Sequence, residues 1–280
     1  MWADVFQISQ ERQYLFVVCH NMKPSLSITI FFISVSFTCL SQTFVDTLKQ
    51  DIKKYSLVSI IKKDLAILKS NKHFVTVYES EYDFGAKTLN CQFTYDKYWY
   101  TLVGHFINDK VISIELSKRI EDSDITIYKS QFQLLDTLLA TQHLSKHNSF
   151  YSSNKKLSDF FFQRFERFSY SCGIAGQTPE SMMDCLTIIK NKDKEDLISL
   201  ATSLAPTDRA YGVFGLYILS RLGNKLTESE SKLIKLNQKS KADAYNCSGC
   251  ITGTQPLNDL LDNKSLKWYY AWYKRTGKQY

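Results

Sequence analysis

The chain has 280 residues, of which 44% are hydrophobic and 14% aromatic, so it can build a buried core and is not a disordered chain. Its ten Gly and four Pro are too few for a turn-dense sandwich or propeller. The formal net charge is +7, but the lysines are scattered and do not cluster on one helix. We therefore interpret the charge as a solvated surface and expect no nucleic-acid partner. Attraction to an anionic envelope surface or a polyanionic glycan is the alternative.

Met22–Ser41 is typical of a secretory signal peptide, with a basic start, an apolar run and small residues at its end. The run Leu26–Leu40 is shorter than the roughly 20 apolar residues of a spanning helix, so we expect no transmembrane anchor in the mature chain. Cleavage at the end of this segment starts the mature chain at Gln42, in the periplasm or outside the cell. Cys39 raises the alternative of a lipoprotein. We expect residues 1–21 to be a mis-assigned upstream extension, with Met22 as the true start.

Residues 42–130 are expected to form a helix followed by antiparallel strands. Phe44–Leu68 has apolar residues at three-to-four spacing, which predicts one long amphipathic helix. Alternating patterns then predict strands. These are a strand that begins near Phe74, then Leu89–Tyr95, Tyr98–Ile107, Val111–Leu116 and the short Ile125–Tyr128. Asn108 and Asp109 predict a hairpin turn.

Residues 131–280 are expected to form an all-α helical domain. Helical periods and cap signals predict a series of helices. They are Gln131–His147, Leu157–Phe168, Glu180–Lys190, Lys194–Leu204, Asp208–Leu222 and a helix opened by the capping box of Thr227 and Glu230. The predicted fold class is therefore α+β, with an N-terminal helix and a small antiparallel sheet followed by an all-α domain.

Cysteines of the second half are candidates for disulfide bonds, because an exported protein folds in an oxidising compartment. The candidates are Cys172, Cys185, Cys247 and Cys250. We expect two bridges, with the connectivity open and with Cys91 left as a buried thiol. Two alternatives remain: Cys247 and Cys250 have the spacing of a redox-active pair, and all four cysteines could hold zinc.

His143 and His147 lie four residues apart on a predicted helix, and Asp136 falls on the same face. A carboxylate with two imidazoles can hold a metal ion that activates water. The opposite face carries leucines, so we expect these histidines to be ordinary exposed side chains.

Aromatic residues close the chain at Trp268, Tyr269, Trp272 and Tyr273, beside several basic residues. In a helix they form two adjacent ridges at i,i+4 spacing. Such rings are candidates for binding a sugar or a partner protein. The alternative is that they dock the last helix onto the core.

No nucleophile elbow, phosphate-binding glycine loop or dinucleotide fingerprint occurs in the sequence. We therefore expect an exported, non-catalytic binding or structural module of the cell envelope, without a cofactor, whose partner is an envelope protein or glycan. The alternatives are an envelope hydrolase, metal-assisted or with a carboxylate pair, and a thiol oxidoreductase that uses Cys247 and Cys250.

Overall fold

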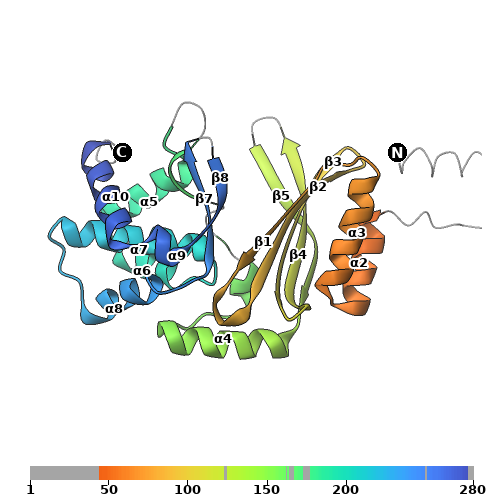
Figure 1. The fold of residues 1–280 in the computed structure, drawn as a ribbon, viewed down its shortest axis with the longest axis horizontal. Coiled ribbons are helices and arrows are strands. Elements are labelled where there is room, and N and C mark those ends of the chain that lie inside the picture. Colours follow the sequence, from red (N-terminus) through yellow and green to blue (C-terminus); the bar gives the residue numbers. More distant parts are fainter. Residues whose placement is uncertain are drawn as a thin grey trace, which may run out of the picture.

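The computed structural model describes residues 44–122, 125–161, 163, 167–172, 177–249 and 251–276, without the side chains of 121, 122, 125 and 126. The predicted signal peptide, its cleavage site and the upstream extension lie outside the described residues. The described chain has two halves (Figure 1). The first joins two helices to a five-stranded sheet, and the second packs helices around a smaller sheet.

The first half begins with helices α2 (Phe44–Tyr55) and α3 (Val58–Ser70), where the sequence predicted one helix. The single-helix prediction is wrong because Ser56 has a positive φ of 51°, which interrupts the helix. The break is tied to a turn of the sheet, since the backbone N–H of Val58 donates to the carbonyl oxygen of Asp109. The Asp109 carboxylate also accepts from the backbone N–H of Ser59 at 2.7 Å, at the start of α3.

The sheet is antiparallel with its strands in chain order. Its strands are β1 (Val75–Glu81), β2 (Lys87–Tyr95), β3 (Tyr98–Ile107), β4 (Lys110–Asp122) and β5 (Ile125–Leu135). Alternate residues point to opposite faces, and α2 and α3 cover one face, where Leu89, Cys91 and Phe93 are fully buried. The predicted hairpin at Asn108 and Asp109 is confirmed, and both residues adopt the positive φ values of a tight turn.

The predicted helix Gln131–His147 is wrong in its first turn, because residues up to Leu135 belong to β5. Phe132 and Leu134 pair with Leu116 and Ile114 of β4 and pack onto the core beneath α2 and α3. Helix α4 (Thr137–Tyr151) begins only after Asp136, whose carboxylate accepts from the backbone N–H of Leu139. The boundary placed between residues 130 and 131 therefore lies inside β5.

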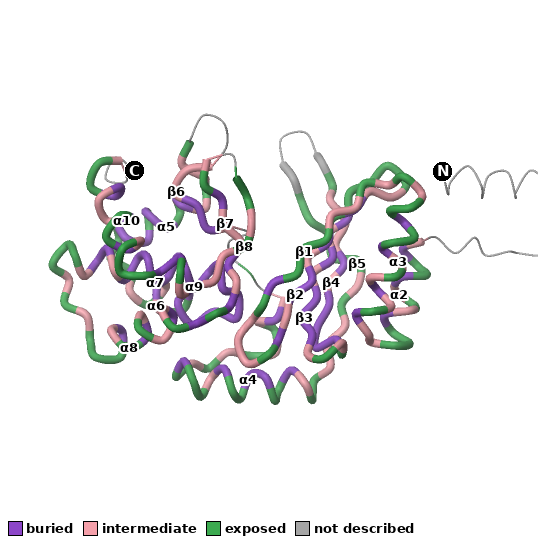
Figure 2. Tube along the Cα trace, in the orientation of Figure 1, coloured by how far each residue is buried: buried purple, intermediate pink, exposed green. Residues whose placement is uncertain are grey.

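The second half continues from α4 with the 3₁₀ turn η2 and then with further helices and strands. They are η2 (Leu157–Phe161), β6 (Phe168–Cys172), α5 (Glu180–Asn191), α6 (Lys194–Ala201), α7 (Pro206–Arg221), α8 (Glu228–Asn237), β7 (Asp243–Gly249), β8 (Ile251–Pro256), α9 (Leu257–Leu260) and α10 (Asn263–Arg275). Helix α7 is the centre of this half and is buried along most of its length (Figure 2). A Cβ on Gly212 of α7 would lie 2.2 Å from the backbone nitrogen of Ala201, so only glycine permits this packing of α6 on α7.

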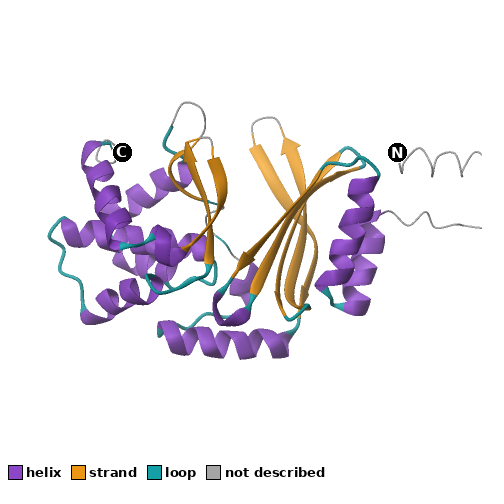
Figure 3. Ribbon diagram, viewed as in Figure 1, coloured by secondary structure: helices purple, strands orange, loops and turns teal. Residues whose placement is uncertain are grey.

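The prediction of a small sheet followed by an all-α domain is wrong. The five-stranded sheet is large and stands in the middle of the molecule, and the second half contains a three-stranded sheet of order β6-β7-β8 (Figure 3). β6 is parallel to β7, and the β7–β8 hairpin turns at Gly249, which has a φ of 59°. These short strands lack a strong alternating pattern, and β6 is paired with a segment that lies far away in the sequence. None of the helices in the described ranges combines the length and apolar character needed to cross a membrane.

Candidate functional site

A pocket of about 450 Å³ opens between the three-stranded sheet and helix α10. Its walls come from β6, β7, β8 and the first turns of α10, so it depends on segments that lie far apart in the sequence. Its lining residues are Phe168, Tyr170, Asn246, Cys247, Ser248, Gln255, Leu260, Asp262, Lys264, Ser265, Trp268 and Tyr269. We call this the α10 pocket.

One wall of the α10 pocket is aromatic. Trp268 keeps 42% of its surface exposed, whereas Tyr269 and Trp272 on the same helix are buried. Tyr170 of β6 meets Trp268 edge to face, with ring centroids 4.5 Å apart. The Tyr170 hydroxyl and the Ser248 hydroxyl lie 2.8 Å apart, which holds the tyrosine against β7. The wall is therefore a positioned pair of rings that includes a partly exposed indole.

The polar groups of the pocket are amides, hydroxyls and the charged side chains of Asp262 and Lys264. Asn246 Nδ2 donates to Gln255 Oε1 at 2.7 Å, and within the described chain the Asn246 oxygen and the Gln255 nitrogen make no further hydrogen bond. One acceptor and one donor thus remain for a ligand. At the start of α10, hydrogen bonds from Ser265 lower the pKa of Asp262, so its carboxylate stays ionised at neutral pH. Lys264 beside it balances this negative charge.

The disulfide bond Cys172–Cys247 links β6 to β7 next to the pocket. Two of the four disulfide candidates are therefore paired, and Cys250 lies outside the described residues. The expectation of a second disulfide bond is wrong for Cys185. Its thiol is buried against α7, with Sγ 3.8 Å from the backbone oxygen of Tyr211. Cys91 is a buried thiol as predicted, and burial raises its pKa to about 12.

The four aromatic binding candidates on α10 differ in burial. Tyr269, Trp272 and Tyr273 are buried in the core of the second half, as the docking alternative expects, and Tyr269 also lines the pocket. Trp268 lines the pocket and is exposed, so it stays a candidate for binding. Tyr170, Asn246 and Gln255 were not predicted as site residues, because their strands were not predicted. The only local signals were the β-branched residues Ile251, Thr252 and Thr254 around β8.

The set of Asp136, His143 and His147 does not form a site, and the expectation that the histidines are exposed is wrong. Asp136 caps α4, while His143 and His147 turn inward and contact the ring of Phe84. His147 Nε2 is 2.9 Å from the carbonyl oxygen of Thr202. Burial lowers the pKa of both histidines to about 4, so both are neutral at pH 7. Among the described residues, no three His, Cys, Asp or Glu side chains come together as a metal site.

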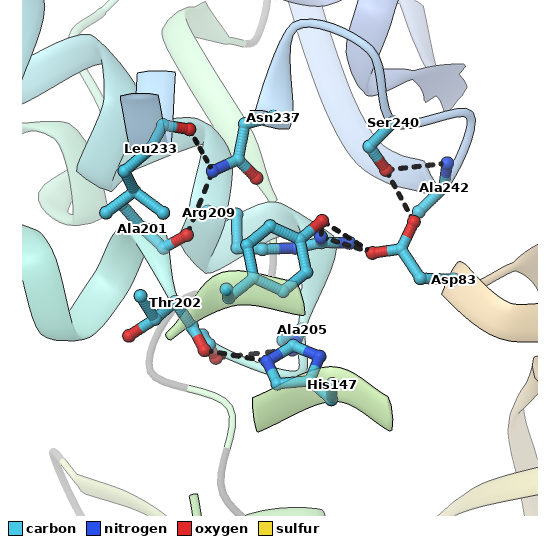
Figure 4. Close-up of polar contacts among 12 residues, drawn as sticks. Asp83, His147, Ala201, Thr202, Ala205, Arg209, Leu233, Asn237, Ser240 and Ala242 are labelled. Carbon is cyan, nitrogen blue, oxygen red and sulfur yellow. Dashed lines mark hydrogen bonds and ion pairs between the residues drawn. The ribbon is translucent and has the colours of Figure 1, made fainter. Parts of the chain in front are cut away.

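A buried ion pair joins the two halves (Figure 4). Asp83 in the β1–β2 turn accepts from Arg209 of α7, from Tyr151 and from Ser240, the last at 2.7 Å. Arg209 is fully buried. Burial alone would raise the pKa of Asp83, but the guanidinium and the two hydroxyl donors hold it below its ordinary value. The adjacent Phe84 has a φ of 62°, an uncommon conformation that directs this turn into the second half. We assign the network to stability.

A second, smaller pocket of about 150 Å³ lies where the five-stranded sheet meets η2. His105, Glu115 and Asp159 contribute to its lining. His105 is engaged, with Nδ1 3.0 Å from the Thr88 hydroxyl, and burial lowers its pKa to about 4. Its volume is below the roughly 300–1,000 Å³ of typical small-molecule sites.

Comparison with protein-family models, with curated proteins and with solved structures finds no match. The function is therefore argued from the geometry of the sites alone.

Proposed function

We propose that the protein is an exported, non-catalytic binding protein of the cell envelope that takes a neutral sugar unit of a glycan into the α10 pocket. The observation that carries this proposal is the exposed side chain of Trp268, which contacts Tyr170 and lines one pocket with the amides of Asn246 and Gln255. Ligand pockets commonly combine aromatic side chains with a few placed polar groups, which is the combination found here.

The chemistry of the pocket matches a sugar. The C–H face of a pyranose ring is apolar and packs on an indole, while its hydroxyls both donate and accept hydrogen bonds. Asn246 Oδ1 can accept from one hydroxyl, and Gln255 Nε2 can donate to another. The ring contact contributes about 0.5–1.5 kcal/mol and each hydrogen bond about 1 kcal/mol. Together the ring contact and two hydrogen bonds amount to about 2.5–3.5 kcal/mol, which corresponds to a dissociation constant of roughly 3–15 mM.

The two catalytic alternatives have less support. The metal-assisted hydrolase needs Asp136, His143 and His147 around one open position, but these residues point to different surroundings. The thiol oxidoreductase needs Cys247 paired with Cys250, but Cys247 is bonded to Cys172. A binding role requires only the side chains that already line the α10 pocket.

The test is calorimetric titration of the purified protein with chitotriose and maltotriose as short neutral probes. We expect millimolar binding of at least one of them and a loss of about three- to tenfold in affinity for Trp268→Ala. Leu222→Ala is the matched control, because Leu222 is exposed to a similar extent and lies outside the pocket. Equal affinities of the two variants, or no binding of either sugar, would contradict the proposal.

Export is tested separately, by the intact mass of the protein recovered from cells that express the full sequence. We expect a mature chain that starts at Gln42, with Cys172 and Cys247 protected from alkylation. A chain that retains Met22 would contradict the proposal that the protein is exported. It would not contradict the proposal that the α10 pocket binds a sugar.

A further inference from the structure

The sheet face opposite α2 and α3 carries its side chains in regular rows. In Figure 1 this face is turned toward β7 and β8. The first row, next to the β2–β3 turn, is Phe74, Thr94, Trp99, Arg119 and Tyr128. The second row is Thr76, Gln92, Thr101, Ser117 and Ser130. The third row is Tyr78, Asn90, Val103, Glu115 and Gln133. We call these three rows the open face.

Aromatic rings mark the two sides of the first row. Phe74 and Trp99 form an edge-to-face pair with centroids 5.0 Å apart, and both are exposed. Tyr128 is also exposed and stands on β5, two strands away from Trp99 on β3. Neighbouring strands are about 4.8 Å apart, so the two ring positions are separated by about 10 Å, roughly the length of a disaccharide.

The second row, which lies between the aromatic first row and the third row, is polar and uncharged. It offers hydroxyl groups on β1, β3, β4 and β5 and the amide of Gln92 on β2. Across the open face the charged members are Arg119 in the first row and Glu115 in the third, and Glu115 also lines the small pocket beside η2. Glu115 in addition accepts a hydrogen bond from Gln133 at 3.0 Å.

The composition of the open face favours one class of ligand over the others. A protein interface would need an apolar core, and a nucleic acid would need rows of Lys and Arg. A neutral glycan needs spaced rings for its C–H faces and uncharged groups for its hydroxyls, which the open face provides.

We infer that the open face of the five-stranded sheet is a second binding site, which takes an extended neutral polysaccharide lying across the strands from Trp99 to Tyr128. Tyr78 meets Tyr245 of β7 with centroids 5.8 Å apart, so the second half bounds the open face at its third row. The glycan chain therefore lies over the first two rows. The inference does not depend on the α10 pocket, which shares no residue with the open face.

The sheet itself supplies matched controls, because adjacent residues point to opposite faces. Trp99 is 38% exposed on the open face, and Tyr98 is 45% exposed on the other face, where Lys118 lies over its ring. Tyr128 is 46% exposed on the open face, and Ile127 beside it is 51% exposed on the other face. Trp99→Ala is thus compared with Tyr98→Ala, and Tyr128→Ala with Ile127→Ala.

The experiment is native gel electrophoresis of the intact protein through gels that contain mixed-linkage β-glucan, galactomannan or dextran. We expect at least one polysaccharide to retard the protein. Trp99→Ala and Tyr128→Ala should each weaken the interaction about three- to tenfold, while Tyr98→Ala, Ile127→Ala and Trp268→Ala keep it. Urea unfolding of each variant confirms that it is folded.

Three results would overturn the inference: no retardation by any of the polysaccharides, equal losses within a matched pair, or self-association that Trp99→Ala abolishes, since a second copy would then cover the open face. Loss of trisaccharide binding in Trp268→Ala tests the α10 pocket alone, so the two sites can fail separately.

Discussion

Removing the Asp83 carboxylate tests how the two halves are held together. The Asp83→Ala variant leaves Arg209 with a buried positive charge and takes the acceptor from the hydroxyls of Tyr151 and Ser240. Arg209 has no access to solvent in the folded protein, so it cannot regain hydration without local opening. Asp83→Ala should therefore lower the free energy of unfolding of the whole protein.

The magnitude follows from burial. Breaking a buried ion pair by removing one partner costs about 3–5 kcal/mol, and we take about 4 kcal/mol here. The matched comparison is the Lys62–Glu79 pair, whose Nζ and Oε1 are 2.5 Å apart but whose side chains are both exposed. Such a pair is worth about 0–1 kcal/mol. The charges are in direct contact in both pairs, so the difference reports burial together with the hydrogen bonds that Tyr151 and Ser240 donate to Asp83.

Urea unfolding followed by circular dichroism measures both effects. With a denaturant slope of about 2.5 kcal/mol/M, Asp83→Ala should lower the midpoint by about 1.6 M, and Glu79→Ala by less than about 0.4 M. Adding Arg209→Met to Asp83→Ala should recover part of the loss, because it removes the unpaired charge. Equal midpoints for Asp83→Ala and Glu79→Ala would refute the reasoning, and so would a double variant less stable than Asp83→Ala.

Three further predictions concern pH and the disulfide bond. Burial lowers the pKa of three histidines to about 4, so the unfolded chain binds protons between pH 6.5 and 4 that the folded chain does not, and stability should fall over that range. These histidines are His105, His143 and His147. A urea midpoint that is constant from pH 7 to 4.5 would contradict the predicted loss of stability. Burial and the nearby Asp51 raise the pKa of Asp64 to about 6, so its contribution to stability is full below pH 3.8 and is lost above 6. Asp64→Asn should therefore stabilise the protein by about 1 kcal/mol at pH 7.5, and a lower thermal midpoint would show the opposite. Cys172→Ala should cost about 4 kcal/mol, because the bond to Cys247 closes a loop with a sequence separation of 75, and an unchanged urea midpoint would count against it.

Local signals predicted the elements whose ends depend on their own residues. Thr227 and Glu230 form the capping box expected at the start of α8, and Asn108 and Asp109 form the β3–β4 turn. In both places one or two side chains satisfy the backbone groups of their immediate neighbours. No distant segment is needed, so the sequence pattern is sufficient.

Elements that depend on distant partners were predicted poorly. Phe132 and Leu134 alternate as strand residues do, but the leucines that follow them suggested a helix, and pairing with β4 decides the outcome. The inward position of His143 and His147 follows from the insertion of Phe84, which comes from a turn far away in the chain. A helix face that accepts a partner of this kind has no separate signature in its own sequence.

The candidate site was predicted in part. Trp268 and Tyr269 were chosen for their spacing on one helix, and both line the α10 pocket. The opposite wall was not predicted, because β6 is parallel to β7 and joins it across a large separation in sequence. The open face of the sheet could be recognised only from the register of all five strands.

The most direct test of the binding account is the nitrogen–proton NMR spectrum of the tryptophan indoles during titration with chitotriose and maltotriose. We expect the indole signal of Trp268 to shift in proportion to saturation, while that of Trp272, buried one helical turn away, stays in place. A Trp268 signal that is unmoved by both sugars, or one that moves no more than that of Trp272, would contradict the assignment of the α10 pocket as a sugar site.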